Sequence, residues 1–415
     1  MQLHAVDIKN AFVKVDRPTN GEDVYMHIDA ATVKILVEIK PEYKRFVLTD
    51  GTMVVKIIKA LYGMLDSGKL FYDDLVSCLR STGFKQSGDD QCLWKLNLEG
   101  HTTILAVHID GILAVTPRPQ DYEFVRNALI NRYKEIKEHS GKMLSYLGMN
   151  INMNKSNWTI DQNGLTEELF KKHDINQGCK TPPRYWPKAT AEEVDKELCK
   201  RYRSLLMSLF YIARLTRHDI LHHISALSTF SASPQIGHMT ALMTILHYLY
   251  ETKDFKINIH AEQDINMVCY VDASWASHRD GKSHSGMVIK MGRTTICAYS
   301  RKQQLLGKSS AEAELIAISD FIPVISCCRD VIIFITDCDV VPLIMEDNAA
   351  VIGLLTQDYH AKQRHITVRY EYIKKSVKNK DLKIQYLNTK EIIADILTKP
   401  LGGELFSRLR SQLLG

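Results

Sequence analysis

The first 150 residues alternate between strand-like and helix-like patterns of apolar positions. Leu3 to Ile8, Ile104 to Val115 and Leu147 to Ile151 are apolar runs with the composition of β-strands. From Leu70 to Ser81 the apolar residues recur at helical spacing instead. This part of the chain is therefore expected to have an α+β fold.

A polar, proline-bearing stretch at residues 179–197 is typical of a linker or long loop. Beyond it, Tyr202 to Leu215 and Met239 to Tyr250 are amphipathic at helical spacing. The sequence therefore predicts an all-helical region over residues 198–255.

Short apolar runs of β type return after Ile257, with the sequences MVCYVDA, SGMVIKM and TTICAYS. Helical patterns follow at Ser310 to Phe321, at Asn348 to Leu355 and after His365, and one more strand is expected at Leu382 to Leu387. Three strands followed by alternating helices and strands predict a compact α/β unit with a mixed sheet.

Composition narrows the class of protein. Of the 415 residues, 45% are apolar and 24% are charged, which is typical of globular domains, and the net charge of +5 is only a mild basic excess. The nine cysteines are scattered and form no C-x-x-C pair, which argues against a disulfide framework or a zinc ribbon and favours a reducing setting. No run of about 18 apolar residues predicts a membrane span.

Four carboxylates stand in apolar surroundings, where a lone ionised carboxylate would be costly. Asp272 and Asp347 lie at expected strand ends, and Glu314 and Asp395 lie on expected helix faces. If the sheet brings them together, they require a cation, and oxygen-only ligands favour Mg²⁺ or Mn²⁺. The alternative is that each acid separately caps a helix or ends a strand.

Five separated segments resemble the ribonuclease H region that ends the Pol polyprotein of copia-type LTR retrotransposons. They read YVDASWASHRDGKSHSG, SRKQQLLGKSSAEAELIA, MEDNAAVIGL, RHITVRYEYIKKSV and ADILTKPL. The resemblance implies a ribonuclease H fold in which Asp272, Glu314, Asp347 and Asp395 hold two metal ions and cleave RNA in RNA–DNA hybrids. Thr367 departs from the family, which usually has an aspartate there.

Earlier segments resemble the polymerase of the same family. VDIKNAF is similar to its first palm motif, which implies that Asp7 is a metal ligand and that Ala11 and Phe12 contact the nucleotide. ALYGMLDSGKLFY is similar to the template-contacting motif and places Gly63 in the nucleotide site. HIDG falls where the family has a hairpin with two aspartates, so the resemblance makes Asp110 the second palm metal ligand.

Several departures lead us to expect impaired DNA synthesis. The second aspartate of the hairpin is replaced by Gly111 and its aromatic residue by His108. Asp66 places a negative charge in the template-contacting motif. The chain also begins six residues before Asp7, whereas the fingers that hold the triphosphate lie upstream in the family.

The whole chain is thus expected to be an α+β multi-domain protein. Residues 1–155 would be a truncated reverse-transcriptase palm without its fingers, residues 156–262 a thumb or connection, and residues 263–415 an α/β ribonuclease H-like domain with a mixed sheet. The expected partners are RNA–DNA hybrids, template-primer nucleic acid and other proteins of the element. By analogy with the family, the location would be a cytoplasmic virus-like particle or the nucleus.

Two other functions remain open. The chain could be a catalytically inactive relic, or a co-opted protein that binds nucleic acid through basic surfaces. It could also be a full polymerase that receives its fingers from another chain. Separately, His218 and His222 form a helical i, i+4 pair that could bind a transition metal, but the absence of a third ligand nearby favours core or surface histidines.

Overall fold

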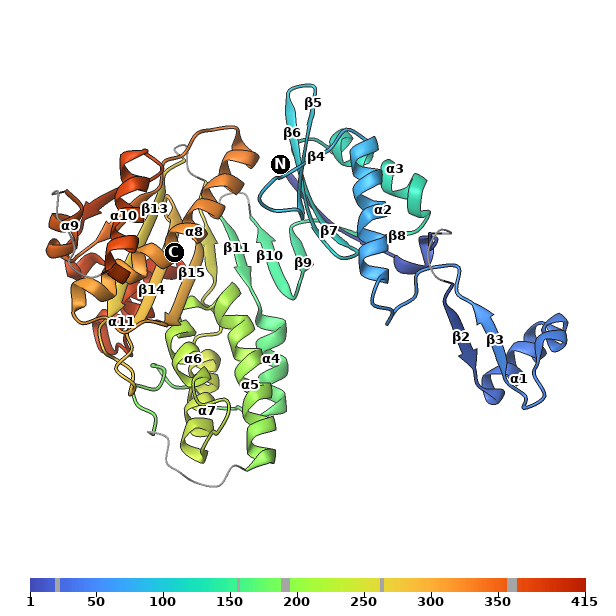
Figure 1. Ribbon diagram of the computed structural model, residues 1–415, viewed down its shortest axis with the longest axis horizontal. Coiled ribbons are helices and arrows are strands. Elements are labelled where there is room, and N and C mark those ends of the chain that lie inside the picture. The colour runs from blue at the N-terminus through green and yellow to red at the C-terminus, as the bar shows by residue number, and fades with distance from the viewer. Residues whose placement is uncertain (19–22, 155–156, 188–194, 262–264, 357–363) are drawn as a thin grey trace. The chain divides into compact units, whose positions relative to one another are not determined.

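The structure is a computed structural model that describes residues 1–18, 23–154, 157–187, 195–261, 265–356 and 364–415. The chain forms two compact units, residues 1–141 and residues 142–415. Each unit has its own sheets and helices (Figure 1). Within the described residues, no helix is both long and apolar enough to cross a lipid bilayer.

The first unit contains a six-stranded antiparallel sheet in the order β4-β5-β6-β7-β1-β8. In that order the strands span Lys85–Gln86, Leu93–Leu98, His101–His108, Gly111–Thr116, Gln2–Ile8 and Ile136–Ser140. Strand β1 lies between β7 and β8, so the N-terminal strand is a central part of the sheet.

Two helices, α2 (Ser67–Ser81) and α3 (Pro119–Tyr133), pack on this sheet. Their apolar faces bury Phe71, Leu75 and Leu129 against strand residues such as Trp94. The helix expected from the spacing after Leu70 is thus confirmed, because its periodic apolar stripe is what the sheet covers.

A smaller part of this unit consists of residues 25–56. Strands β2 (Tyr25–Ile28) and β3 (Met53–Lys56) form an antiparallel pair. Between them in the sequence lie helix α1 (Ala30–Ile39) and the 3-10 helix η2 (Pro41–Phe46). A further 3-10 helix, η1, spans Phe12–Lys14. The sequence pattern did not predict these elements, because most of their side chains remain exposed and carry no strong periodicity.

The second unit begins with a four-stranded antiparallel sheet in the order β12-β11-β10-β9. These strands span Ile257–Ile259, Trp158–Asp161, Met149–Met153 and Met143–Tyr146. A helical segment accompanies it, with helices α4, α5, η3, α6 and α7 at Asn163–Lys172, Lys196–Leu215, His218–Ile220, Leu221–Ser228 and Ile236–Glu251.

The same unit contains a five-stranded mixed sheet in the order β15-β14-β13-β16-β17. These strands span Thr294–Lys302, His284–Met291, Met267–Ser274, Leu343–Glu346 and Lys383–Tyr386. The first three pair antiparallel, whereas β13 with β16 and β16 with β17 pair parallel. The predicted mixed sheet is confirmed.

Helices flank this mixed sheet. They are α8, α9, α10, the 3-10 helices η4 and η5, and α11, which span Ser310–Thr336, Ala349–Thr356, Arg364–Lys378, Thr389–Glu391, Ile393–Leu397 and Gly403–Leu414. Helix α8 was expected to end at Phe321 but continues through Pro323 to Thr336. Burial of Ile325 and Ile332 in the same core explains why the proline does not end it.

Two apolar cores lie within the second unit. One joins α8, α9 and α10 to the mixed sheet. The other joins the helical segment and α11 to sheet residues such as Val288 and Ala298 and to Leu397 of η5. This second core therefore contains residues from both sides of position 262, where a division between connection and ribonuclease H domain was expected. That division stays a prediction.

The expected linker at residues 179–197 contains no helix or strand in its described part before α5 begins at Lys196. Residues 188–194 lie outside the described residues. The part that is described packs on the helical segment, since the Cys179 N–H donates to the His247 carbonyl at 3.1 Å and Trp186 contacts the apolar core.

Candidate functional site

Asp272 lies near the end of β13, the strand flanked by β14 and β16. The parallel register of β13 and β16 pairs Tyr270 with Met345, and two residues further it brings Asp272 beside Asp347. Sheet topology thus explains why two acids separated by about 75 residues meet at one edge.

Glu314 comes to the same place from the first turns of α8. One carboxylate oxygen from each of Asp272, Glu314 and Asp347 lies within 4.8 Å of the others. Asp272 and Glu314 are buried, and Asp347 is half-buried. The structure therefore brings three of the four predicted C-terminal acids together; their role as metal ligands stays a prediction.

The protonation of this carboxylate cluster is perturbed. Burial raises the pKa of Asp272 to about 7, and the nearby charges of Asp395 and Asp347 add to that effect. Burial and the neighbouring Glu346 and Asp272 raise the pKa of Glu314 well above its usual value. Buried acids with a like charge nearby are held as a pair only when a proton or a cation neutralises them.

Glu346 is a fourth acid at this site that the sequence analysis did not select. It is the last residue of β16, it is fully buried, and its pKa is raised to about 8, chiefly by burial. It directly precedes Asp347, and adjacent residues of a strand usually point to opposite faces, so Glu346 was not expected to point toward the same site. An acid in the apolar run LIME was the available signal.

Asp395 lies on η5 and makes a different contact. Its Oδ1 is 2.5 Å from Nζ of Lys399, which is also 3.8 Å from Oδ2 of Asp272. The Thr398 hydroxyl donates to Asp272 as well. Asp395 therefore meets the carboxylate cluster through Lys399, and its role as a metal ligand stays a prediction.

Close packing of η5 on the sheet depends on Gly286, which pairs with Asp272 across β13 and β14. A Cβ on Gly286 would lie 2.7 Å from Cγ2 of Thr398 and 2.9 Å from the Ala394 carbonyl. Any side chain there would push away the segment that carries Thr398 and Lys399.

The carboxylate cluster fits a hard divalent cation. Its donors are oxygens only, and Oε2 of Glu314 and Oε2 of Glu346 are buried without a hydrogen-bond partner in the described part of the chain. Unpaired buried carboxylate oxygens are costly unless a cation or a proton binds them. Mg²⁺ and Mn²⁺ prefer such ligands.

The first unit contains the other predicted acids. Asp7 of β1 pairs with Gly111 of β7, and the Ile8 N–H donates to the Asp110 carbonyl at 3.0 Å. Asp7 and Asp110 thus lie at the same edge of this sheet. Asp7 is exposed and Asp110 is half-buried, so both are accessible to a ligand.

Phe12 and Tyr62 form an aromatic pair at this edge, with ring centroids 4.6 Å apart. Burial, followed by the charges of Asp110 and Asp7, raises the pKa of Tyr62. Tyr62 was not predicted as a site residue, although it directly precedes Gly63 in the chain. Ala11 is fully buried, and Gly63 has a φ of 93°, which favours glycine.

The β6–β7 hairpin forms as expected around Ile109 and Asp110. Its left-handed residue is Ile109, with a φ of 56°. Asp66, the acid that departs from the template-contacting motif, forms an ion pair with Arg17 at 2.7 Å. Its charge is thus compensated within the unit.

The histidines considered as a metal pair are core residues. His218, His222 and His223 are all buried. The His218 Nδ1 lies 3.0 Å from the Ala213 carbonyl, which fixes that ring without a metal. Of the two placements that the sequence favoured, core and helix surface, the structure shows the core.

Comparisons with known proteins give relatives over the whole chain. The chain is 27% identical over 420 residues to the retrovirus-related Pol polyprotein from transposon RE1 of Arabidopsis thaliana, covering 99% of this chain and 27% of that protein. It is 25% identical over 433 residues to the corresponding protein from transposon TNT 1-94 of Nicotiana tabacum, covering 100% of this chain and 31% of that one. No protein-family model matches the chain.

Among solved structures, the foamy viral protease-reverse transcriptase in complex with dsDNA is similar in fold. The TM-score is 0.53 at 13% identity, and the match covers 94% of this chain and 68% of that chain. The α+β multi-domain architecture predicted from the sequence is confirmed, as is the resemblance to the copia-type family. The chain spans about a third or less of the length of these curated relatives.

Proposed function

Since the chain corresponds to the reverse transcriptase and ribonuclease H region of copia/Ty1-type Pol polyproteins, we propose that its carboxylate cluster cleaves the RNA strand of RNA–DNA hybrids. The observation that carries this proposal is the meeting of Asp272, Glu314 and Asp347 within 4.8 Å at one edge of the mixed sheet.

The chain's own residues prepare this site in two ways. Asp272, Glu314 and Asp347, with Asp395 beside them, would hold two Mg²⁺ or Mn²⁺ ions, which supply activation of water and of the scissile phosphate when bound. Lys399 holds Asp395 and lies next to Asp272, so the site is partly neutralised before any ion binds.

DNA synthesis is proposed to be impaired. Asp7 and Asp110 would hold metal ions at the palm, and Phe12, Ala11 and Gly63 would contact the nucleotide. Gly111 supplies no carboxylate beside Asp110, so a metal ion there has one charged ligand fewer. Arg17 compensates the charge of Asp66, so Asp66 is no longer a reason to expect impaired synthesis. The missing carboxylate at Gly111 is still such a reason.

The remaining assignments are also proposals. Residues 1–155 would act as the palm, residues 156–262 as the thumb or connection and residues 263–415 as the ribonuclease H domain. Template-primer nucleic acid and other proteins of the element would be partners. The location would be a cytoplasmic virus-like particle or the nucleus.

A hybrid-cleavage assay with Mg²⁺ tests the nuclease proposal. Wild type should cut the RNA strand, Asp347→Asn should lose at least about a hundredfold in rate, and Asp381→Asn, which removes an exposed acid elsewhere, should cleave like wild type. Equal inactivity of all three proteins would refute the proposal and favour the inactive relic.

Primer extension on an RNA template tests the second part. Wild type is expected to extend poorly or not at all in Mg²⁺. Robust extension would show that Asp7 and Asp110 suffice and would contradict the proposed impairment.

A further inference from the structure

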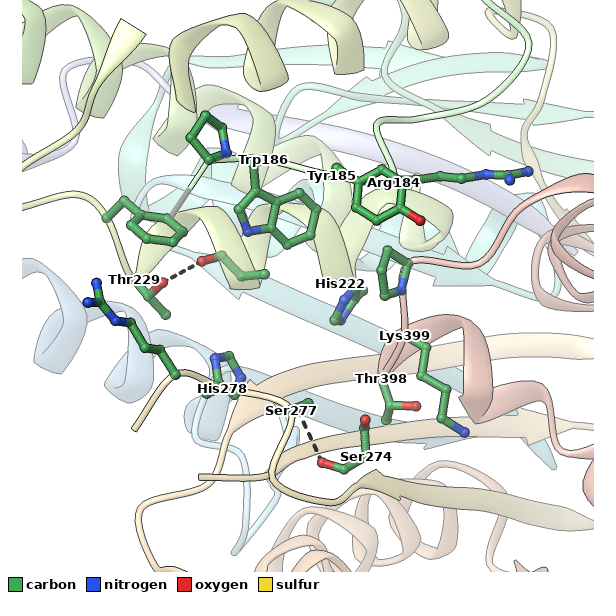
Figure 2. A pocket seen from close by; sticks show the side chains of 15 residues that line it. Arg184, Tyr185, Trp186, His222, Thr229, Ser274, Ser277, His278, Thr398 and Lys399 are labelled. Carbon is green, nitrogen blue, oxygen red and sulfur yellow. Dashed lines mark hydrogen bonds between the residues drawn. The ribbon is translucent and has the colours of Figure 1, made fainter. Parts of the chain in front are cut away.

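A cavity of about 540 Å³ lies beside the carboxylate cluster, wholly within the second unit. Among the described residues, four segments line it: residues 184–187, helix α6 with the turn that follows, the end of β13 with the loop after it, and residues 398–400 (Figure 2). Thr398 and Lys399 line the cavity and also contact Asp272, so the cavity and the carboxylate cluster share a wall.

The lining of this cavity is cationic and aromatic. It includes the cations Arg184, Arg279 and Lys399 and the rings of Tyr185 and Trp186, and none of the described residues that line it is an aspartate or glutamate. The lining also includes the hydroxyl-bearing residues Ser274, Ser277, Thr229 and Thr398. Phosphate groups are bound by such cations, and nucleobases stack on such rings.

The two residues that flank Tyr185 and Trp186 in the chain pack closely against glycines. A Cβ on Gly402 would lie 1.9 Å from Nη2 of Arg184, and one on Gly237 would lie 2.2 Å from Cγ of Pro187. The Pro187 carbonyl also lies 2.8 Å from Nε2 of His238, a fully buried residue. Residues 184–187 are thus docked at both ends.

His222 is one of the lining residues and carries a buried polar atom without a partner in the described residues. The residue is only 5% exposed, its ring centroid lies 6.4 Å from that of Trp186, and its Nδ1 has no hydrogen-bond partner in the described residues. Figure 2 shows it between Trp186 and Thr398. Burial, with His284 and His223 nearby, holds its pKa well below the usual value, and the other ring nitrogen bonds the Leu397 carbonyl.

A neutral ring whose other nitrogen donates to a carbonyl has Nδ1 as a hydrogen-bond acceptor. The missing partner must therefore be a donor, and among the groups of a nucleotide these are the sugar hydroxyls and the N–H groups of the base. We propose that this cavity binds one ribonucleotide of the RNA strand, next to the nucleotide held at the carboxylate cluster.

In this arrangement Arg184 binds phosphate, the base stacks on Trp186, and a 2′-hydroxyl donates to His222 Nδ1. The assignment rests on the proposed ribonuclease H function, because it uses the same bound hybrid. It adds a strand-specific contact made by residues from the helical segment.

Equilibrium binding tests the assignment without cleavage. Fluorescence anisotropy is measured for a labelled RNA–DNA hybrid, a DNA duplex and free AMP, with every protein carrying Asp347→Asn. Arg184→Gln and Trp186→Leu should each weaken hybrid binding about tenfold, and Arg184→Gln should lower the salt slope by about one. Arg408→Gln, which removes an exposed cation elsewhere, should bind like the parent protein.

His222→Phe separates the sugar contact from the rest. It should reduce the preference for hybrid over DNA duplex about fivefold while folding is retained by circular dichroism. Unchanged hybrid affinity in both Arg184→Gln and Trp186→Leu would overturn the cavity assignment alone. Absence of hybrid binding by the parent protein would overturn the proposed function and this assignment together, and AMP binding tighter than hybrid binding would overturn the strand assignment.

Discussion

The ammonium group of Lys399 lies 3.8 Å from Oδ2 of Asp272, inside the carboxylate cluster. Lysine thus supplies a positive charge where a metal ion would also be attracted. We predict that Lys399→Met raises the affinity for Mn²⁺ by roughly tenfold and lowers metal-free stability by about 1 kcal/mol, the latter kept small because Lys399 is partly exposed.

Calorimetric titration with Mn²⁺ and urea unfolding in EDTA measure the two effects. Lys383→Met removes an exposed lysine of β17 and serves as the control. Unchanged or weaker Mn²⁺ binding in Lys399→Met would show that the lysine does not compete with cations.

Glu314→Gln should separate stability from metal binding. The raised pKa of Glu314 means that the folded protein holds its proton more tightly than the unfolded chain, so stability falls as pH rises above about 4.5. The amide removes this loss. In EDTA we expect Glu314→Gln to match wild type near pH 4 and to exceed it by about 1–2 kcal/mol at pH 8.

The same variant should no longer be stabilised by Mg²⁺ or Mn²⁺. Thermal unfolding with and without the ion measures this. A metal-induced shift equal to that of wild type would exclude Glu314 as a ligand.

The buried His223 should make the second unit less stable at low pH. Burial lowers its pKa to about 4, and both ring nitrogens lack partners in the described residues. The unfolded chain takes up the proton near pH 6.5, so stability is lost as pH falls below that value. His223→Leu should remove about 2 kcal/mol of the stability difference between pH 7.5 and pH 5. Identical pH dependence in urea unfolding would contradict this.

Gly111→Asp should restore a carboxylate to the palm. The left-handed residue of the hairpin is Ile109, so the backbone does not require glycine at position 111. In an Asp347→Asn background, we expect Mn²⁺ binding by the first unit to tighten roughly tenfold, because ligand charge sets cation affinity. Equal titration curves would show that the palm lacks more than this one acid.

Much of the architecture could be predicted because periodicity records which face is buried. The apolar stripe after Leu70 is the face that α2 packs on its sheet, and the runs around Asp272 and Val288 are strands of the mixed sheet. Residues 25–56 have no such periodic apolar pattern, since few of their side chains are buried.

The carboxylate cluster was predicted only in part for a different reason. Asp272 and Asp347 meet through strand register, which follows from topology, whereas the contact between Asp395 and Lys399 depends on side-chain conformation. Glu346 was missed because it directly precedes an acid that had been chosen. His222 was considered only as half of a metal pair, because its place in a helix does not show that one of its ring nitrogens lacks a hydrogen-bond partner.

The apolar core that joins the helical segment to the back of the mixed sheet has a practical consequence for dissecting this protein. Ile393, Ile396 and Leu397 belong to that core and surround Asp395 in the chain. A recombinant fragment starting at residue 263 would lose the helices that cover these residues. Poor solubility or inactivity of such a fragment would then reflect the loss of the helices that complete its apolar core. Genetic screens for nuclease defects should also recover substitutions in those helices, far along the chain from the carboxylate cluster.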